Sequence, residues 1–257
     1  MRPQKQLNTR YGNMIIFSDD PTIGCSLELY GEYCYPEIEL ILKFVNSTSM
    51  FLDIGANIGT HTVAIAPYVK NVVAFEADAE NCDLLRMNCG LQDKKVARKI
   101  SVNHLALSNR VGKTSTVFDY GKTHLSNEGG TDVVMTMLDN IKGFPSVDFI
   151  KIDVEGMEYN VLQGAKNTIA YYRPHMLIEM QDSNMNPFVF DLLASMSYNM
   201  YWAPCATYNP QNHKHNSENV FGKQHGVLNW LCTPQPIDTK LTPVTDRTDN
   251  IEKAVNR

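Results

Sequence analysis

The stretch that decides the fold is Phe51-Leu52-Asp53-Ile54-Gly55-Ala56-Asn57-Ile58-Gly59-Thr60-His61. A short apolar run ends in an acid, and a tight turn with two glycines follows. The apolar residues 63–66 then predict the start of a helix. Strand, glycine turn and helix are the unit with which an α/β sheet builds a nucleotide pocket, because glycines allow a ligand to lie against the main chain.

Strands and helices alternate on both sides of this turn. We expect strands at 12–17, 71–76, 100–107, 147–153, 175–180, 198–202 and 227–232, with weaker ones at 113–119 and 133–138. We expect helices at 36–45, 63–69, 78–91, 159–165 and 188–195, and a flexible polar loop at 121–131. This order predicts an α/β fold with a mostly parallel sheet and helices on both faces. Ligands of such sheets bind at the carboxyl ends of the strands, where we place Asp53, Glu76, Asp153 and Glu179.

The composition limits the classes of function. The chain has 257 residues, 43% hydrophobic and 20% charged, enough for an ordinary core. Its formal charge of −5 argues against nucleic acid as the main partner. No apolar run approaches the roughly 20 residues of a membrane span. Residues 1–7 lack the apolar core of a signal peptide. Nothing in the sequence indicates an oligomeric state.

The six cysteines are scattered and form no C-x-x-C pair. Cys82 and Cys89 would lie two turns apart on one helix, about 10 Å at the standard rise, which is too far for a disulfide. We therefore expect reduced thiols and a cytoplasmic protein.

Glu76 is the candidate for holding a ribose. It follows Asp53 by 23 residues, after one helix. This is about the spacing at which an acid ends the second strand of a nucleotide-binding unit and accepts hydrogen bonds from the ribose diol. The alternative is an acid that only caps the following helix.

The turn itself indicates which nucleoside is bound. Dinucleotide sites use G-x-G-x-x-G, whereas here Asn57 stands at the second glycine position and Thr60 at the third. The leading Asp53 would repel a pyrophosphate but suits a ligand with an ammonium group. S-adenosylmethionine has such a group, a positive sulfonium and a ribose diol, so the turn favours this methyl donor over NAD.

Four segments carry a family resemblance: Phe51–Gly59, Ala74–Glu76, Ile150–Glu158 and Val161–Ala165. Together they resemble the FkbM-type methyltransferases, over roughly residues 30–232. The block Lys151-Ile152-Asp153-Val154-Glu155-Gly156 is the most specific part. The resemblance implies a Rossmann-like, seven-stranded class I methyltransferase fold and S-adenosylmethionine-dependent methyl transfer, usually to a hydroxyl of a sugar, glycan or small natural product.

Roles carried over from the family give the donor site. The resemblance implies that Gly55, Asn57 and Gly59 form the donor turn, with Asp53 beneath it near the methionine amino group. Glu76 would hold the ribose. Leu105, at the end of the third strand, would pack on the adenine; the alternative for this leucine is plain core packing. The same resemblance divides the chain into a lid and helical segment (1–50), the methyltransferase domain (51–232) and a flexible polar tail (233–257).

Asp153 and Glu155 are the candidate catalytic residues, because the family places the end of the fourth strand opposite the methyl group. Methylation of a hydroxyl requires loss of its proton, and a carboxylate within reach could take it. Two adjacent acids would raise the pKa of one of them. Alternatively, Asp153, Glu155 and Glu179 could hold a divalent cation such as magnesium, or only cap and anchor local structure. No ligand spacing is diagnostic, so we predict no metal site.

Other functions on this fold remain open at this point. A nicotinamide-dependent oxidoreductase would be expected to have glycine at position 57. A non-catalytic nucleoside-binding module would need Glu76 but no acid at position 155. An N-methyltransferase would be expected to have an N-P-P-Y-like motif where this chain has Asp153-Val154-Glu155-Gly156.

Overall fold

The centre of the fold is an eight-stranded sheet. Its neighbouring strands, in order, are β14 (Thr242–Pro243), β12 (Asn199–Ala206), β13 (Gly226–Thr233), β11 (His175–Glu179), β10 (Phe149–Ile152), β3 (Met50–Ile54), β4 (Asn71–Glu76) and β5 (Ile100–His104). The computed structural model describes residues 2–119, 122–126, 130–180, 184–222 and 226–249. The five strands from β11 to β5 are parallel, whereas β13 runs antiparallel to both β11 and β12. The prediction of a mostly parallel sheet is confirmed.

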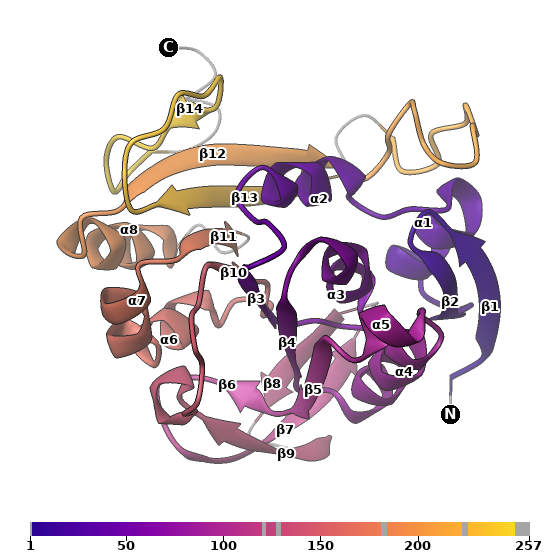
Figure 1. The fold of residues 1–257 in the computed structure, drawn as a ribbon, viewed down its shortest axis with the longest axis horizontal. Helices are drawn as coiled ribbons and strands as arrows, with labels where there is room; N and C mark the ends of the chain where they lie inside the picture. Colours follow the sequence, from indigo (N-terminus) through magenta and orange to yellow (C-terminus); the bar gives the residue numbers. More distant parts are fainter. Residues whose placement is uncertain (1, 120–121, 127–129, 181–183, 223–225, 250–257) are drawn as a thin grey trace.

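Helices cover both faces of this sheet. They are α3 (Thr60–Ile65), α4 (Ala79–Gly90), α5 (Lys94–Ala97), α6 (Glu158–Gln163), α7 (Lys166–Tyr172) and α8 (Asn186–Ser195), with short 3₁₀ helices at Ala66–Tyr68 and Leu138–Asn140. Figure 1 shows α3, α4 and α5 on one side of the sheet and α6, α7 and α8 on the other. Every residue of β3 is buried, as expected for a strand covered on both faces. Asp78 begins α4 by accepting a hydrogen bond from the Asn81 amide at 2.9 Å.

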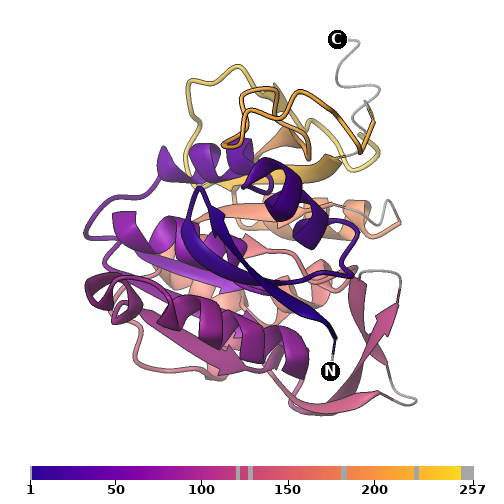
Figure 2. The same ribbon diagram turned by 90° about the vertical axis from the view of Figure 1, so that its right-hand side faces the viewer.

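The N-terminal segment forms a hairpin of β1 (Gln4–Thr9) and β2 (Gly12–Phe17), followed by α1 (Ile23–Tyr30) and α2 (Tyr35–Leu42). Figure 2 shows the hairpin beside α4. Asn88 of α4 fastens it, since this side chain accepts from the Ile15 amide at 2.6 Å and donates to the Ile15 carbonyl at 3.0 Å. The expected strand at 12–17 and the helix beginning near Pro36 are present. The sequence did not indicate β1, because five of its six residues are polar, nor α1.

The strand count differs from the expected seven because β14 pairs antiparallel with the end strand β12. Its two residues lie in a polar, proline-containing region with no strand pattern. Val244, directly after β14, is buried, and the remaining tail residues 250–257 lie outside the described part of the chain.

The expected third strand, 100–107, is broken at Leu105. Its first part is β5, whereas β6 (Ala106–Leu107) leaves for a second sheet with β9 (Thr131–Thr136), β7 (Gly112–Asp119) and β8 (Lys122–Ser126), in the order β6-β9-β7-β8. β5 carries alternating apolar residues at Ile100 and Val102 and β6 is wholly apolar, so the sequence pattern does not mark the break. The expected loop 121–131 contains β8, and its residues 121 and 127–129 lie outside the described residues. The weaker strands expected at 113–119 and 133–138 are present as β7 and β9, which pair antiparallel.

Among the described residues, no helix combines the length and the apolar character needed to cross a membrane.

Of the two glycines in the central turn, Gly55 packs more closely against main-chain atoms of another segment. Its φ is +81°, and a Cβ on this residue would lie 1.7 Å from the Asp153 carbonyl oxygen. We predict that Gly55→Ala lowers the free energy of unfolding by at least about 2 kcal/mol, because both the left-handed backbone and the overlap with main-chain atoms oppose a side chain. Urea denaturation followed by circular dichroism measures this.

Gly90→Ala is the matched control, because a Cβ at Gly90 meets nothing within 4 Å and the residue ends α4. We expect this variant to gain about 0.5–1 kcal/mol from the better helix propensity of alanine. Equal stability of the two variants would contradict the assignment of Gly55 as a contact point.

Candidate functional site

A cavity of about 550 Å³ opens at the carboxyl ends of the parallel strands. Its walls come from the turn after β3, the ends of β4, β10 and β11, the Leu105–Leu107 segment, the residues that begin α1, and the start of β13. Three of the four acids expected at strand ends line it: Glu76, Asp153 and Glu179. The cavity therefore lies at the edge of the sheet where the sequence predicts the site.

The glycine turn is tied to the end of β4. The amides of Gly55 and Ala56 both donate to the Phe75 carbonyl, at 2.9 and 3.0 Å. Asn57 has a left-handed φ of 51° and donates its amide to Glu76 Oε2 at 2.7 Å. Asparagine tolerates this conformation better than most residues, which explains how it replaces glycine here. Gly55 and Asn57 both line the cavity.

Glu76 is buried at the cavity wall, with 5% of its surface exposed. Besides Asn57, its other oxygen accepts from the Asp78 amide at 2.8 Å. Burial raises the pKa of Glu76 to about 7, although the backbone hydrogen bonds act in the opposite direction. A carboxylate has about four acceptor positions, so this one keeps capacity for a ligand that offers hydroxyl groups.

Asp53 and Gly59 lie behind the turn and do not line the cavity. Asp53 is fully buried, and its Oδ2 accepts from the Thr62 hydroxyl at 2.6 Å. Its Oδ1 has no hydrogen-bond partner among the described residues. A Cβ on Gly59 would lie 2.4 Å from Leu85 Cδ1, so this glycine allows α3 to pack against α4. Both residues shape the turn from within the core.

The apolar part of the cavity lies between β4 and the break at Leu105. Phe75, Leu105, Ala106 and Leu107 line it. The Leu105 amide donates to the Glu76 carbonyl at 3.0 Å, which holds the broken strand against the end of β4. Leu105 thus stands beside Glu76, as expected for a residue next to a nucleoside base.

A buried lysine controls the charge of Asp153. Lys151 Nζ lies 2.8 Å from Asp153 Oδ2, and the lysine side chain is only 4% exposed. Burial by itself would raise the pKa of Asp153, but the Lys151 ammonium outweighs it and holds this pKa well below its usual range. Of the two acids, Asp153 is therefore not the one whose pKa is raised. It is a weak base and is ionised at neutral pH.

Glu155 stands on a strained turn. Its φ is +50°, followed by Gly156 at +93°, and its side chain lines the cavity. Glu158 of α6 fixes the turn, because its Oε1 accepts from the amides of Val154 and Gly156, both at 3.1 Å. Non-glycine residues held at positive φ cluster at functional sites, where the surrounding structure supports the strain.

Asp153, Glu155 and Glu179 converge, with one carboxylate oxygen from each within 4.8 Å of the others. Three hard oxygen ligands at this spacing suit a cation such as magnesium. The sequence left this alternative open, and the structure brings its three residues together.

The pairing of Lys151 with Asp153 was not predicted from the sequence. Lys151 lines the cavity, as do His61 and Tyr33. His61 Nε2 lies 3.2 Å from Glu37 Oε2 of α2. One signal for Lys151 was available: a lysine inside an otherwise apolar strand, two residues before an acid, shares its face of the strand with that acid. No comparable signal marked Glu37.

We predict that Lys151→Met lowers the free energy of unfolding by about 3–5 kcal/mol at pH 7, because the removed ammonium leaves buried carboxylates uncompensated. The pKa of Asp153 is lowered to about 2 in the wild type, so its ion pair contributes its full stabilisation above the unfolded-state pKa of about 4 and loses it as the pH falls from there toward 2. The variant should therefore approach the wild type as the pH falls below about 4. Urea titrations at pH 7 and at about pH 2.5 test this.

The control for Lys151 is Lys95→Met on the exposed surface of α5, which should change stability by less than about 0.5 kcal/mol. A Lys151→Met protein as stable as this control at pH 7 would refute the role of the buried ion pair.

Comparisons with known proteins agree with this geometry. The chain is 30% identical over 139 residues to the hexuronic acid methyltransferase AglP of Haloferax volcanii, which is 51% of this chain and 56% of AglP. It therefore covers only about half the length of that relative. The crystal structure of an FkbM methyltransferase from Methylobacillus flagellatus KT superposes with a TM-score of 0.52 and 17% identity, over 72% of this chain and 44% of that one.

Trm5b from Pyrococcus abyssi superposes with a TM-score of 0.51 and 7% identity, over 90% of this chain and 55% of that one. At these identities both structures show a shared fold alone. The sequence profile of the methyltransferase FkbM domain matches residues 53–200, which include the glycine turn, Glu76 and the block from Lys151 to Glu158. Since that match covers more than half of the chain, the protein belongs to the FkbM methyltransferase family.

Proposed function

We propose that this protein is an S-adenosylmethionine-dependent O-methyltransferase that acts on a hydroxyl group of a sugar or glycan. One observation carries the proposal: a buried carboxylate anchored to a glycine turn, Glu76, shares a cavity with three convergent acids at the ends of β10 and β11. The Glu76 carboxylate is suited to a ribose, and the three convergent acids are suited to an acceptor hydroxyl. The name of AglP supports a sugar acceptor.

The donor side of the cavity fits S-adenosylmethionine in three respects. The Glu76 carboxylate can accept from the ribose hydroxyls, and Leu105 with Phe75 offers an apolar wall for the base. Thr60 lines the cavity, and its buried Oγ1 has no hydrogen-bond partner among the described residues, so rotation of this side chain would offer a hydroxyl to the polar amino-acid tail. When bound, S-adenosylmethionine supplies a methyl group on a positive sulfonium, which suits the acidic walls of this cavity.

On the acceptor side the three acids have different roles. Asp153, held ionised by Lys151, can accept a hydrogen bond from an acceptor hydroxyl and orient it. Glu155, on its strained turn, is our choice for the group that takes the hydroxyl proton. Glu179 completes the cluster and, with the other two, could position a cation that binds neighbouring hydroxyls of a sugar.

The rival functions receive less support. A dinucleotide-dependent oxidoreductase would place a pyrophosphate against the turn, where Asp153, Glu155 and Glu179 would all repel it. A non-catalytic nucleoside-binding module leaves the strain at Glu155 and the convergence of the acids unexplained. Calorimetric titration with S-adenosylmethionine separates these options. No binding by the purified protein at millimolar donor would overturn the proposal, and tight binding of NAD instead would favour the oxidoreductase.

We predict that the affinity for S-adenosylmethionine rises by up to roughly tenfold between pH 6 and pH 8. The pKa of Glu76 is about 7 without ligand, and the ionised carboxylate is the form that accepts from both ribose hydroxyls, so ionisation favours binding. Glu76→Gln should weaken binding about 100-fold, since hydrogen bonds to a charged group are lost, and should abolish the pH dependence assigned to Glu76. Calorimetry at several pH values measures both effects.

The exposed Glu80, in the first turn of α4, supplies the control, and Glu80→Gln should keep the affinity and pH profile of the wild type. If Glu76→Gln also kept them, the ribose assignment would be wrong.

We predict that removing the Glu155 carboxylate lowers the turnover rate but not the affinity for the donor. Glu155→Gln should lower kcat by about 10²–10⁴-fold, the range for removal of a general base, and leave the donor Kd within about twofold. The assay uses methyl-labelled donor with a panel of neutral sugars and hexuronic acids, and mass spectrometry identifies the methyl ether. A variant that transfers methyl at the wild-type rate removes Glu155 from the mechanism.

A further inference from the structure

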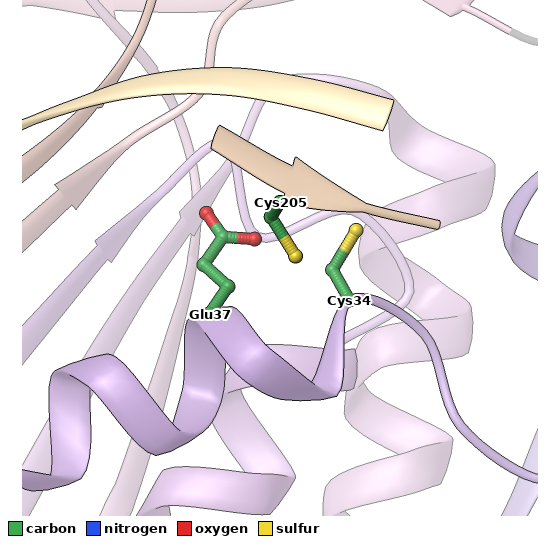
Figure 3. Close-up of side chains that lie close together, drawn as sticks. All are labelled: Cys34, Glu37 and Cys205. Atoms are coloured by element: carbon green, nitrogen blue, oxygen red, sulfur yellow. The ribbon is translucent and has the colours of Figure 1, made fainter. Parts of the chain in front are cut away.

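Two cysteines and a glutamate meet in the core outside the cavity. Cys34 directly precedes α2, Glu37 lies in the first turn of α2, and Cys205 lies near the end of β12. All three are buried, at 1%, 4% and 5% exposure. One Sγ or carboxylate oxygen from each lies within 4.8 Å of the other two, and Figure 3 shows the three side chains directed toward one another.

We propose that Cys34, Cys205 and Glu37 bind a zinc ion that fastens α2 to β12. Thiolates and a carboxylate are ordinary zinc ligands, and a hard cation such as magnesium would not select two sulfurs. Ligand atoms around tetrahedral zinc are about 3.5–3.8 Å apart, so the three groups need to close by about 1 Å or less. Binding would require the side chains to rotate toward the ion by this amount.

The surroundings of Glu37 suit a metal ligand. Its Oε2 lies 3.2 Å from His61 Nε2, and ligating carboxylates are typically held by such an outer hydrogen bond. Two thiolates and one carboxylate exceed the charge of Zn²⁺ by one. The nearby Lys151 ammonium, which is stabilised electrostatically by Glu37, supplies a compensating positive charge. The fourth position of the ion is left to a water molecule.

The location gives the ion a structural role. Cys34 and Cys205 are 171 residues apart in the sequence and belong to the N-terminal segment and to the far half of the main sheet. The Glu37–His61 contact leads from the cluster to the cavity wall, because His61 lines the cavity. Zinc would thus hold the N-terminal segment in place beside the site, and this role does not depend on which methyl acceptor the protein uses.

Cobalt substitution tests the proposal on the whole chain. The purified protein is stripped with a chelator, its metal content is measured, and it is titrated with Co²⁺. We expect one equivalent to bind with a thiolate-to-cobalt charge-transfer absorption, and Zn²⁺ to displace it and raise the melting temperature. Cobalt held by the acids Asp153, Glu155 and Glu179 would lack that absorption, so the spectrum distinguishes the two sites.

Three variants make the test specific. Cys34→Ser and Cys205→Ser should each lose the thiolate absorption, and Glu37→Gln, which keeps the shape of the side chain, should weaken Co²⁺ binding if a cysteine variant fails to fold. Cys25→Ser, in the partly exposed α1 position, is the matched control and should keep both signals. Substoichiometric binding, an absorption that survives both cysteine variants, or a Cys34–Cys205 disulfide found by thiol titration would overturn the proposal.

Discussion

The site depends on a single buried positive charge, the ammonium group of Lys151. Lys151 lies in β10 directly opposite Asp53 of β3 in the parallel register, and two residues before Asp153 on the same face. Its pKa is raised because the attraction of Asp153, Asp53 and Glu37 outweighs the effect of burial. Burying one carboxylate without a cation is costly. Because the Lys151 ammonium attracts three carboxylates, acids can lie at the strand ends without unfolding the sheet.

This arrangement explains why the cavity suits a positively charged ligand. Lys151 pairs with Asp153 and is attracted electrostatically by Asp53 and Glu37, whereas Glu76 lies on the other side of the turn and, within the described part of the chain, accepts its hydrogen bonds from backbone amides. Burial therefore leaves the pKa of Glu76 near 7, while Lys151 keeps that of Asp153 low. A donor with a sulfonium and an ammonium group would favour ionisation of Glu76 and would add to the neutralisation of Asp153. Fold stability and the binding of such a donor would thus depend on the same set of charges.

The features that the sequence predicted are those whose signal lies within one segment. An apolar run that ends in an acid marks β3 and β4, and the glycines of the turn are visible beside them. Lys151 was missed because its partners Asp53 and Glu37 come from other elements, although its spacing from Asp153 was in view. The polar edge strands β1 and β14 carry no alternating pattern, because hydrogen bonds to a neighbouring strand, and not burial of side chains, hold them.

The N-terminal segment shows how the cavity is closed on one side. Glu32 does not line the cavity and is 2% exposed. Its carboxylate accepts from Arg10 at 2.7 Å, Asn209 at 2.7 Å and the His213 amide at 2.9 Å. These bonds join residues 30–36 to the segment after β12. Cys34 of the N-terminal segment also lies beside Cys205 near the end of β12, so this segment contacts both β12 and the chain that follows it. Since Tyr33 of the N-terminal segment and Thr207 after β12 both line the cavity, these contacts hold one wall of the cavity together.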